Sequence, residues 1–125
     1  LAGDQCLRRV GRAIKSQQTR PGDVMARYGG EEVAILLPGA DEAGALAVAE
    51  RVRLAVRDLG LLHEGNEAGI VTVSAGVSAL FPVRDVDAPD KLMREADKAL
   101  YAAKAAGRDR VCCNTQSPLQ SPPPA

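Results

Sequence analysis

The sequence predicts an α/β sandwich, in which helices pack on a mixed β-sheet. Segments with helical periodicity alternate with short strand-like runs in the order α-β-β-α-β-α-β, and two of these runs flank a glycine pair typical of an antiparallel hairpin. Only three of the 125 residues are aromatic, so the alanine-rich chain suits closely packed helices better than a large apolar pocket. The length fits a single domain.

The first expected helix starts at Asp4, whose side chain is a natural N-cap. Its apolar residues recur at helical spacing, at Leu7, Val10 and Ile14. The helix should end before residues 20–23, Arg-Pro-Gly-Asp, which have the composition of a turn.

A hairpin is expected next. Its strands are residues 24–28 (VMARY) and 33–37 (VAILL), and Gly29 and Gly30 between them can supply the positive φ angles of a tight turn. The second run is apolar throughout until Pro38, which favours a strand buried on both faces.

A long helix is expected over residues 42–59, with Asp41 as its N-cap and Gly60 at its end. Its apolar stripe consists of Ala45, Val48, Val52, Val56 and Leu59. Residues 71–78 (VTVSAGVS) then alternate between apolar side chains and small or polar ones, which predicts a strand with one apolar face.

Residues 89–106 are expected to form the third helix, with Pro89 in its first turn and Gly107 at its C-terminal cap. A short strand follows at residues 110–113 (RVCC). Residues 114–125 are rich in Pro, Ser and Gln and predict a disordered tail. The predicted domain therefore covers residues 1–113.

Composition and charge argue against several classes of function. Basic and acidic residues number 16 each, so no bulk charge would attract nucleic acid. No apolar run approaches the roughly 20 residues of a membrane-spanning helix. Three cysteines, an odd number with two of them adjacent, are typical of a reduced chain. We expect a cytoplasmic protein, although a longer parent protein could still be attached to a membrane.

Two carboxylates, Glu31 and Glu32, stand at the tip of the expected hairpin. A solvated turn is one interpretation. The other is a site for Mg²⁺ or Mn²⁺, since Mg²⁺ prefers hard oxygen ligands and usually shares its coordination shell with substrate phosphates. The neighbouring glycines would let a nucleotide approach the backbone closely. The residues alone leave both interpretations open.

Four ordered blocks resemble the signatures of the GGDEF family, the diguanylate cyclases. RYGGEEV is similar to the family signature, with Val33 where Phe is usual. GDQCLRRV resembles the family's Gly-Asp-x-x-Leu helix start, and VTVSAGVS its next strand. ADKALYAAKAAGRDRV is similar to its C-terminal run, with Asp109 where Asn is usual. One four-residue motif would be weak, but four blocks in the family's order, covering about residues 3 to 112, are specific.

The resemblance implies a palm-like fold similar to that of adenylate cyclases, with a ferredoxin-like core. It also implies a Mg²⁺-dependent condensation of two GTP molecules into cyclic di-GMP, with release of pyrophosphate. Each domain of a homodimer would hold one GTP, so that each 3′-hydroxyl attacks the α-phosphate of the other nucleotide.

The resemblance further implies the residues of the site. Glu31 would be a metal ligand and the general base for the 3′-hydroxyl, and Glu32 a second acid at the metal. The expected GTP contacts are Asp4 at the guanine edge, Leu7 in the guanine pocket, Gly29 and Gly30 against the nucleotide, and Lys104 and Arg108 at the terminal phosphates. Without the resemblance, Lys104 and Arg108 would be ordinary cations near a helix C-terminus.

A second site is implied by Arg20 and Asp23, which match the family's inhibitory Arg-x-x-Asp motif for the product, cyclic di-GMP. Arg51 matches a family position that adds another arginine. Arginine suits this task because it makes bidentate phosphate contacts and stacks on guanine. The alternative is a plain turn with a surface salt bridge.

Family members have a further strand before the Gly-Asp helix, which carries an aspartate metal ligand, and this chain begins where that strand would end. We therefore expect a GGDEF domain that lacks its first strand, and 125 residues that are inactive and poorly stable on their own. The alternative function is a non-catalytic GGDEF-like module that binds cyclic di-GMP through Arg20 and Asp23.

Overall fold

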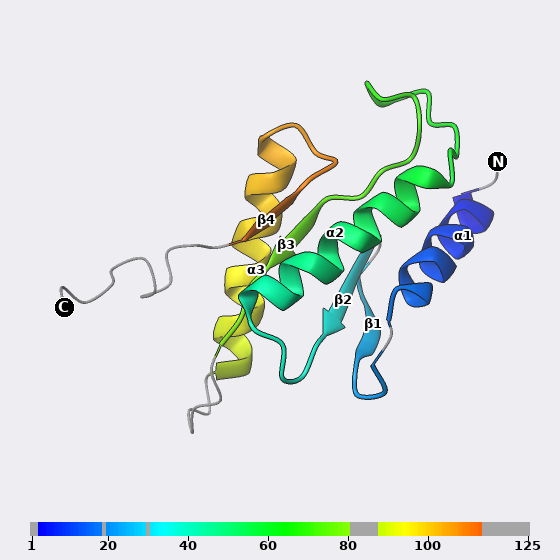
Figure 1. Ribbon diagram of the computed structural model, residues 1–125. Helices are drawn as coiled ribbons and strands as arrows, with labels where there is room; N and C mark the ends of the chain where they lie inside the picture. The colour runs from blue at the N-terminus through cyan, green and yellow to red at the C-terminus, as the bar shows by residue number, and fades with distance from the viewer. Residues whose placement is uncertain (1–2, 19, 30, 81–87, 114–125) are drawn as a thin grey trace.

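The chain forms helices and strands in the order predicted from its sequence. The computed structural model describes residues 3–18, 20–29, 31–80 and 88–113, and this part of the chain contains three α-helices and four β-strands (Figure 1). The elements are α1 (Gly3–Ser16), β1 (Val24–Gly29), β2 (Glu32–Leu36), α2 (Glu42–Asp58), β3 (Ala75–Val77), α3 (Ala88–Ala105) and β4 (Val111–Cys113). The predicted tail lies outside the described residues, so the domain boundary stays a prediction.

Helix α1 packs against α2. Ile14 is buried and Val10 packs beside it, whereas Leu7 is exposed. The helix begins at Gly3, so Asp4 lies in its first turn, and the prediction that Asp4 is the N-cap is wrong. A carboxylate in the first turn still lies near the positive end of the helix dipole.

Strands β1 and β2 form the predicted antiparallel hairpin. After an irregularity in register beyond Arg27, the ladder closes with the pair Gly29 and Glu32, and Glu31 lies in the connecting turn. Gly29 remains a strand residue and does not have the positive φ that we expected of it. Gly30 lies outside the described residues.

Strand β2 is less buried than its apolar sequence predicts. Val33 and Leu36 are exposed, whereas Ala34 and Ile35 are half-buried. Among the described residues β2 pairs only with β1. An apolar strand is buried on both faces only where neighbouring elements cover both, so the prediction of two buried faces is wrong.

Helix α2 supplies two of the three residues at the buried centre of the core. Asp41 is its N-cap, as predicted, and its side chain accepts a hydrogen bond from the backbone N–H of Gly44 (2.8 Å). Val52 and Val56 of the predicted stripe are buried. The chain leaves the helix through Gly60 with a φ of +63°, a conformation that glycine adopts freely.

The hydrophobic core lies between α1, α2 and the strands. Its buried centre consists of Ile14, Val52 and Val56. Partly buried apolar side chains surround this centre: Val10, Ala13, Met25, Ile35, Val48, Val71 and Val73. Each hairpin strand contributes one apolar side chain to this shell, Met25 from β1 and Ile35 from β2.

Only part of residues 71–78 forms a strand. β3 is limited to Ala75–Val77 and pairs in parallel with β4. Residues 71–74 have no ladder partner among the described residues, so the predicted strand was too long. The predicted alternation still holds, because Val71 and Val73 pack against the core.

Strand β3 approaches α3 very closely at Gly76. A Cβ atom at this position would lie 2.2 Å from the carbonyl oxygen of Ala96 and 2.2 Å from the backbone nitrogen of Leu100. Real Cβ atoms do not come so near to a neighbouring backbone, so glycine at this position allows the strand and the helix to pack together.

Among the described residues the strands form two small sheets, antiparallel β1–β2 and parallel β3–β4, so both kinds of pairing expected of a mixed α/β fold are present. Figure 1 shows α3 behind β3 and β4, and both α2 and α3 contact these two strands, so helices pack on this sheet as the α/β sandwich prediction requires. In the described part of the chain, no helix has the length and hydropathy needed to cross a membrane.

Candidate functional site

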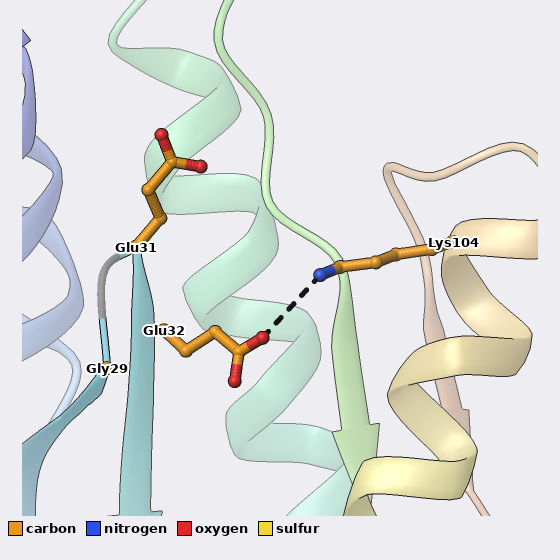
Figure 2. Close-up of a pocket in the computed structure, with 4 residues that line it drawn as sticks. All are labelled: Gly29, Glu31, Glu32 and Lys104. Carbon is orange, nitrogen blue, oxygen red and sulfur yellow. Dashed lines mark ion pairs between the residues drawn. The ribbon is translucent and has the colours of Figure 1, made fainter.

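A cavity of about 390 Å³ lies between the tip of the β1–β2 hairpin and the C-terminal part of α3. Gly29, Glu31, Glu32 and Lys104 line it (Figure 2). The fold thus brings together four of the residues that the sequence singled out, from segments far apart in the chain. The cavity is a shallow pocket that is open to solvent, and its charged side chains are exposed or half-exposed.

Lys104 and Glu32 form a long ion pair across this cavity. The Nζ atom of Lys104 lies 3.8 Å from Oε2 of Glu32, and the two side chains are 39% and 45% exposed. An exposed pair at this distance contributes little to stability, so both groups stay available to a ligand. Figure 2 shows Glu32 extending toward Lys104 and Glu31 pointing away from this pair.

The local structure explains why the two carboxylates diverge. Glu31 lies in the turn and Glu32 is the first residue of β2, where successive side chains point in opposite directions. Lys104 lies in the last turn of α3, where the helix dipole favours a cation. The cavity therefore has carboxylates on its hairpin side and an ammonium group on its helix side.

The two carboxylates point in different directions, so they do not converge on a single metal position in this structure. Within the described ranges, no group of three or more His, Cys, Asp and Glu residues gathers into a metal site. Mg²⁺ commonly uses one or two protein carboxylates together with substrate phosphates and water. A metal ion held by either carboxylate would therefore need further ligands, such as phosphate oxygens or water, beyond those that the described residues supply.

The other predicted GTP contacts do not line the cavity. Asp4 and Leu7 are exposed on α1, and Arg108 is exposed just beyond α3. Gly30 lies outside the described residues. The roles of these four residues stay predictions.

The chain leaves α3 in a left-handed turn. The N–H of Gly107 donates to the carbonyl of Lys104 (3.4 Å), and the N–H of Arg108 donates to that of Ala103 (3.0 Å), which is the hydrogen-bond pattern of a Schellman cap. The φ angles of Gly107, Arg108 and Asp109 are +124°, +63° and +47°. Two successive non-glycine residues in this region are uncommon.

Arg20 and Asp23, the residues of the predicted product site, are held together firmly. Nη2 of Arg20 lies 2.7 Å from Oδ1 of Asp23 and also donates to the carbonyl of Pro38 (2.8 Å). The Asp23 side chain is only 3% exposed, whereas that of Arg20 is 45% exposed. The hydrogen bond to Asp23 raises the pKa of Arg20. Arg51 is exposed on α2, and the described residues show no ion pair between it and either residue.

A cluster of charges that the sequence analysis did not predict joins α2 to the turn after α3. Nη1 of Arg53 donates to Oδ1 of Asp109 (2.9 Å), Arg57 pairs with the other carboxylate oxygen, and the Asp109 N–H donates to Ser74 Oγ (3.2 Å). Arg53 also donates twice to Glu50, at 2.7 Å each. The bonds to Glu50 and Asp109 raise the pKa of Arg53, and the bonds from Arg53 lower the pKa of Glu50.

Part of this cluster has a signal in the sequence. Glu50, Arg53 and Arg57 are spaced three and four residues apart, which places them on one face of a helix. Their partner Asp109 is far away in the chain, and no periodicity connects it to α2.

The comparisons with known proteins identify the family of this chain. Residues 1–110 match the family profile described as "Diguanylate cyclase, GGDEF domain". Diguanylate cyclase A of Treponema denticola is 42% identical over 110 residues, which cover 88% of this chain and 29% of that protein. The response regulator PleD of Caulobacter vibrioides is 39% identical over 110 residues, which cover 87% of this chain and 24% of that protein. This chain thus spans less than a third of the length of either relative.

The solved structures that resemble this chain are also domains of this kind. The active GGEEF domain of a diguanylate cyclase from Vibrio cholerae superposes with a TM-score of 0.74 and 30% identity, covering 92% of this chain and 70% of that one. The GGDEF domain of DgcB from Caulobacter crescentus, in complex with c-di-GMP, gives a TM-score of 0.70 and 29% identity, covering 90% of this chain and 64% of that one. The chain belongs to the GGDEF domain family of diguanylate cyclases.

Proposed function

We propose that this chain is the catalytic domain of a diguanylate cyclase, which condenses two GTP molecules into cyclic di-GMP and releases two pyrophosphates. The observation that carries the proposal is the cavity that combines Glu31 and Glu32 from the hairpin with Lys104 from α3. Carboxylates can hold a divalent cation and an ammonium group can bind phosphate, and nucleotide chemistry needs both.

In the proposed reaction, the oxygen of each 3′-hydroxyl attacks the α-phosphorus of the other GTP, and the bond from that phosphorus to pyrophosphate breaks. Glu31 accepts the proton of the hydroxyl. Each nucleotide is both nucleophile and electrophile, so two domains face each other in a homodimer. Such transfers depend mainly on positioning and on neutralisation of phosphate charge.

The remaining roles follow from the family resemblance. Glu31 and Glu32 would hold Mg²⁺ or Mn²⁺, which when bound neutralises charge on the phosphates. The GTP contacts proposed beside them are Asp4 and Leu7 at guanine, Gly29 and Gly30 at the backbone approach, and Lys104 and Arg108 at the terminal phosphates. The three cysteines are free and GTP is an intracellular substrate, which supports a cytoplasmic location.

A product site at Arg20, Asp23 and Arg51 would make the enzyme subject to inhibition by cyclic di-GMP. Asp23 holds Arg20 in place before any ligand arrives, which lowers the entropy lost on binding. The same preformed pair supports the second function, a non-catalytic module that binds cyclic di-GMP. That the DgcB domain was solved with c-di-GMP fits either function.

Calorimetric titrations of the 125-residue chain separate these functions. For a cyclase domain, GTP with Mg²⁺ binds the unmodified chain, Glu31→Gln weakens this binding by about tenfold, and the affinity for cyclic di-GMP is unchanged. Arg20→Ala should weaken the binding of cyclic di-GMP and leave the affinity for GTP unchanged, because it changes only the product site. Product formation is measured in the same samples, and we expect none from the 125 residues alone.

Each outcome decides between the functions. Binding of cyclic di-GMP without any binding of GTP and Mg²⁺ would overturn the catalytic proposal in favour of the module. Equal GTP affinity of the unmodified chain and Glu31→Gln would remove Glu31 from the site. If neither nucleotide bound, both functions would be wrong.

A further inference from the structure

The turn that carries Arg108 is held in an uncommon conformation. Arg108 and Asp109 both have positive φ, where side chains other than glycine cost free energy. Such residues persist only where the surroundings fix them, and they concentrate at functional sites. The question is which contacts fix this turn.

The contacts come from three segments. Within the turn, the Schellman bond fixes the backbone N–H of Arg108 on Ala103. From the segment that leads into β3, Ser74 Oγ accepts the N–H of Asp109. From α2, Arg53 and Arg57 hold both carboxylate oxygens of Asp109.

The contacts to α2 are the strongest of these. Arg53 and Asp109 are only 17% and 22% exposed, so solvent screens their ion pair less than a surface pair. The hydrogen bonds are charge-assisted and engage both oxygens of one carboxylate, which fixes its orientation as well as its position. Asp109 also neutralises the repulsion between two arginines spaced four residues apart on α2.

We propose that Asp109, held by Arg53 and Arg57, is a positioning residue that fixes the backbone from which Arg108 reaches the terminal phosphates of GTP. This inference rests on the proposed function, in which Arg108 binds those phosphates. Asp109 does not touch the nucleotide, and it acts through the residue before it. Through their ion pairs with Asp109, Arg53 and Arg57 would connect α2 to the phosphate end of the site, although none of the residues that line the cavity belongs to α2.

The test is a double-mutant cycle on the 125-residue chain, with the affinities for GTP and for GMP measured by calorimetry in Mg²⁺. We expect Arg108→Ala and Asp109→Ala each to weaken GTP binding by about tenfold, since the first removes one charge-assisted phosphate contact and the second removes the support that positions it. GMP has no terminal phosphates, so its affinity should not change. The double variant should bind GTP no more weakly than Arg108→Ala alone, because Asp109 acts only through Arg108.

Three further variants separate positioning from general stability. Asp109→Asn should keep GTP affinity within about threefold, because Asn tolerates positive φ and its amide oxygen still accepts one arginine bond. Arg57→Gln, which leaves Asp109 in place, should weaken GTP binding by about threefold and spare GMP. Glu50→Gln removes only the charge of the other partner of Arg53 and should change neither affinity.

Failure of the inference is distinct from failure of the proposed function. If the unmodified chain does not bind GTP with Mg²⁺, the function is wrong and the inference falls with it. If it binds GTP but Asp109→Ala binds equally well, only the inference is overturned. The inference is also overturned if Asp109→Ala weakens the binding of GMP as much as that of GTP. It is likewise overturned if adding Asp109→Ala to Arg108→Ala weakens GTP binding further. If Asp109→Ala does not fold, the GTP and GMP affinities of Arg57→Gln and Asp109→Asn provide the test instead.

Discussion

The two ion pairs at the proposed ligand sites differ in how firmly they are held. Lys104 and Glu32 are 3.8 Å apart and both half-exposed, so a ligand can replace either partner at little cost. Arg20 and Asp23 are 2.7 Å apart, and the carboxylate is almost completely buried. The first pair suits a site that changes partners during a reaction, and the second suits a preformed binding surface.

At the residue scale, we predict that Lys104→Gln separates binding from stability. Its ion pair is exposed, so the midpoint of thermal unfolding should shift by no more than about 2 °C, whereas GTP affinity should fall by about tenfold. Lys98→Gln is the matched control, because Lys98 also lies on α3 and forms an exposed pair, with Glu95 at 3.7 Å. It should change neither property. Equal loss of GTP affinity in both variants would mean that Lys104 acts only through overall charge.

At the element scale, the contact between β3 and α3 determines where the C-terminal end of α3 lies. Gly76 permits this contact, because any side chain there meets backbone atoms of Ala96 and Leu100. Ser78 adds a hydrogen bond from its Oγ to the carbonyl of Leu92 (2.6 Å). Since Lys104 lies in the last turn of α3, a displacement of this helix would also displace the ammonium group of the cavity.

We therefore predict that Gly76→Ala lowers the free energy of unfolding by about 1–3 kcal/mol, because the added methyl group overpacks the interface. Gly11→Ala is the control. Gly11 lies inside α1, with open space where its Cβ would be, so alanine there should stabilise the chain by about 0.5–1 kcal/mol. Urea unfolding of both variants measures the two changes. Gly76→Ala that is as stable as the unmodified chain would contradict the close packing.

The elements set by local signals were predictable from the sequence. The start of α2 follows from the Asp41 cap, and its buried residues follow from the apolar stripe. The extent of β3 and the burial of β2 were not predictable, because both depend on neighbours that are distant in the chain. In the site, the closeness of Glu32 and Lys104 was implied only by family resemblance. The ion pairs of Asp109 were not predicted, because Arg53 and Arg57 lie on α2, more than 50 residues away in the sequence.

At the scale of the whole molecule, the described strands belong to two sheets with no ladder between them. The hairpin that carries Glu31 and Glu32 is attached to the core mainly through Met25 and Ile35. Two-stranded sheets are marginal by themselves and depend on what packs against them. One side of the cavity, the hairpin, thus depends on a few apolar contacts with the core, whereas the other side, α3, packs along β3 and β4.

We predict that the amides of β1 and β2 exchange with deuterium faster than those of α2 and α3, because few packed side chains hold the hairpin. Hydrogen exchange read out by mass spectrometry measures this directly. Hairpin amides that are as protected as those in the middle of α2 would show that the two sheets open as one cooperative unit.

The position of the cavity between the hairpin and α3 links ligand binding to the folding equilibrium. A ligand held by Glu31 and Glu32 on one side and by Lys104 on the other would connect the hairpin to α3. Among the described residues, no strand ladder joins the hairpin to the sheet that packs on α3. Only the folded chain offers both sides at once, so ligand at 100 times its dissociation constant would add about 2.7 kcal/mol to the free energy of unfolding. The nucleotide would then serve this domain as a structural cross-link as well as a substrate.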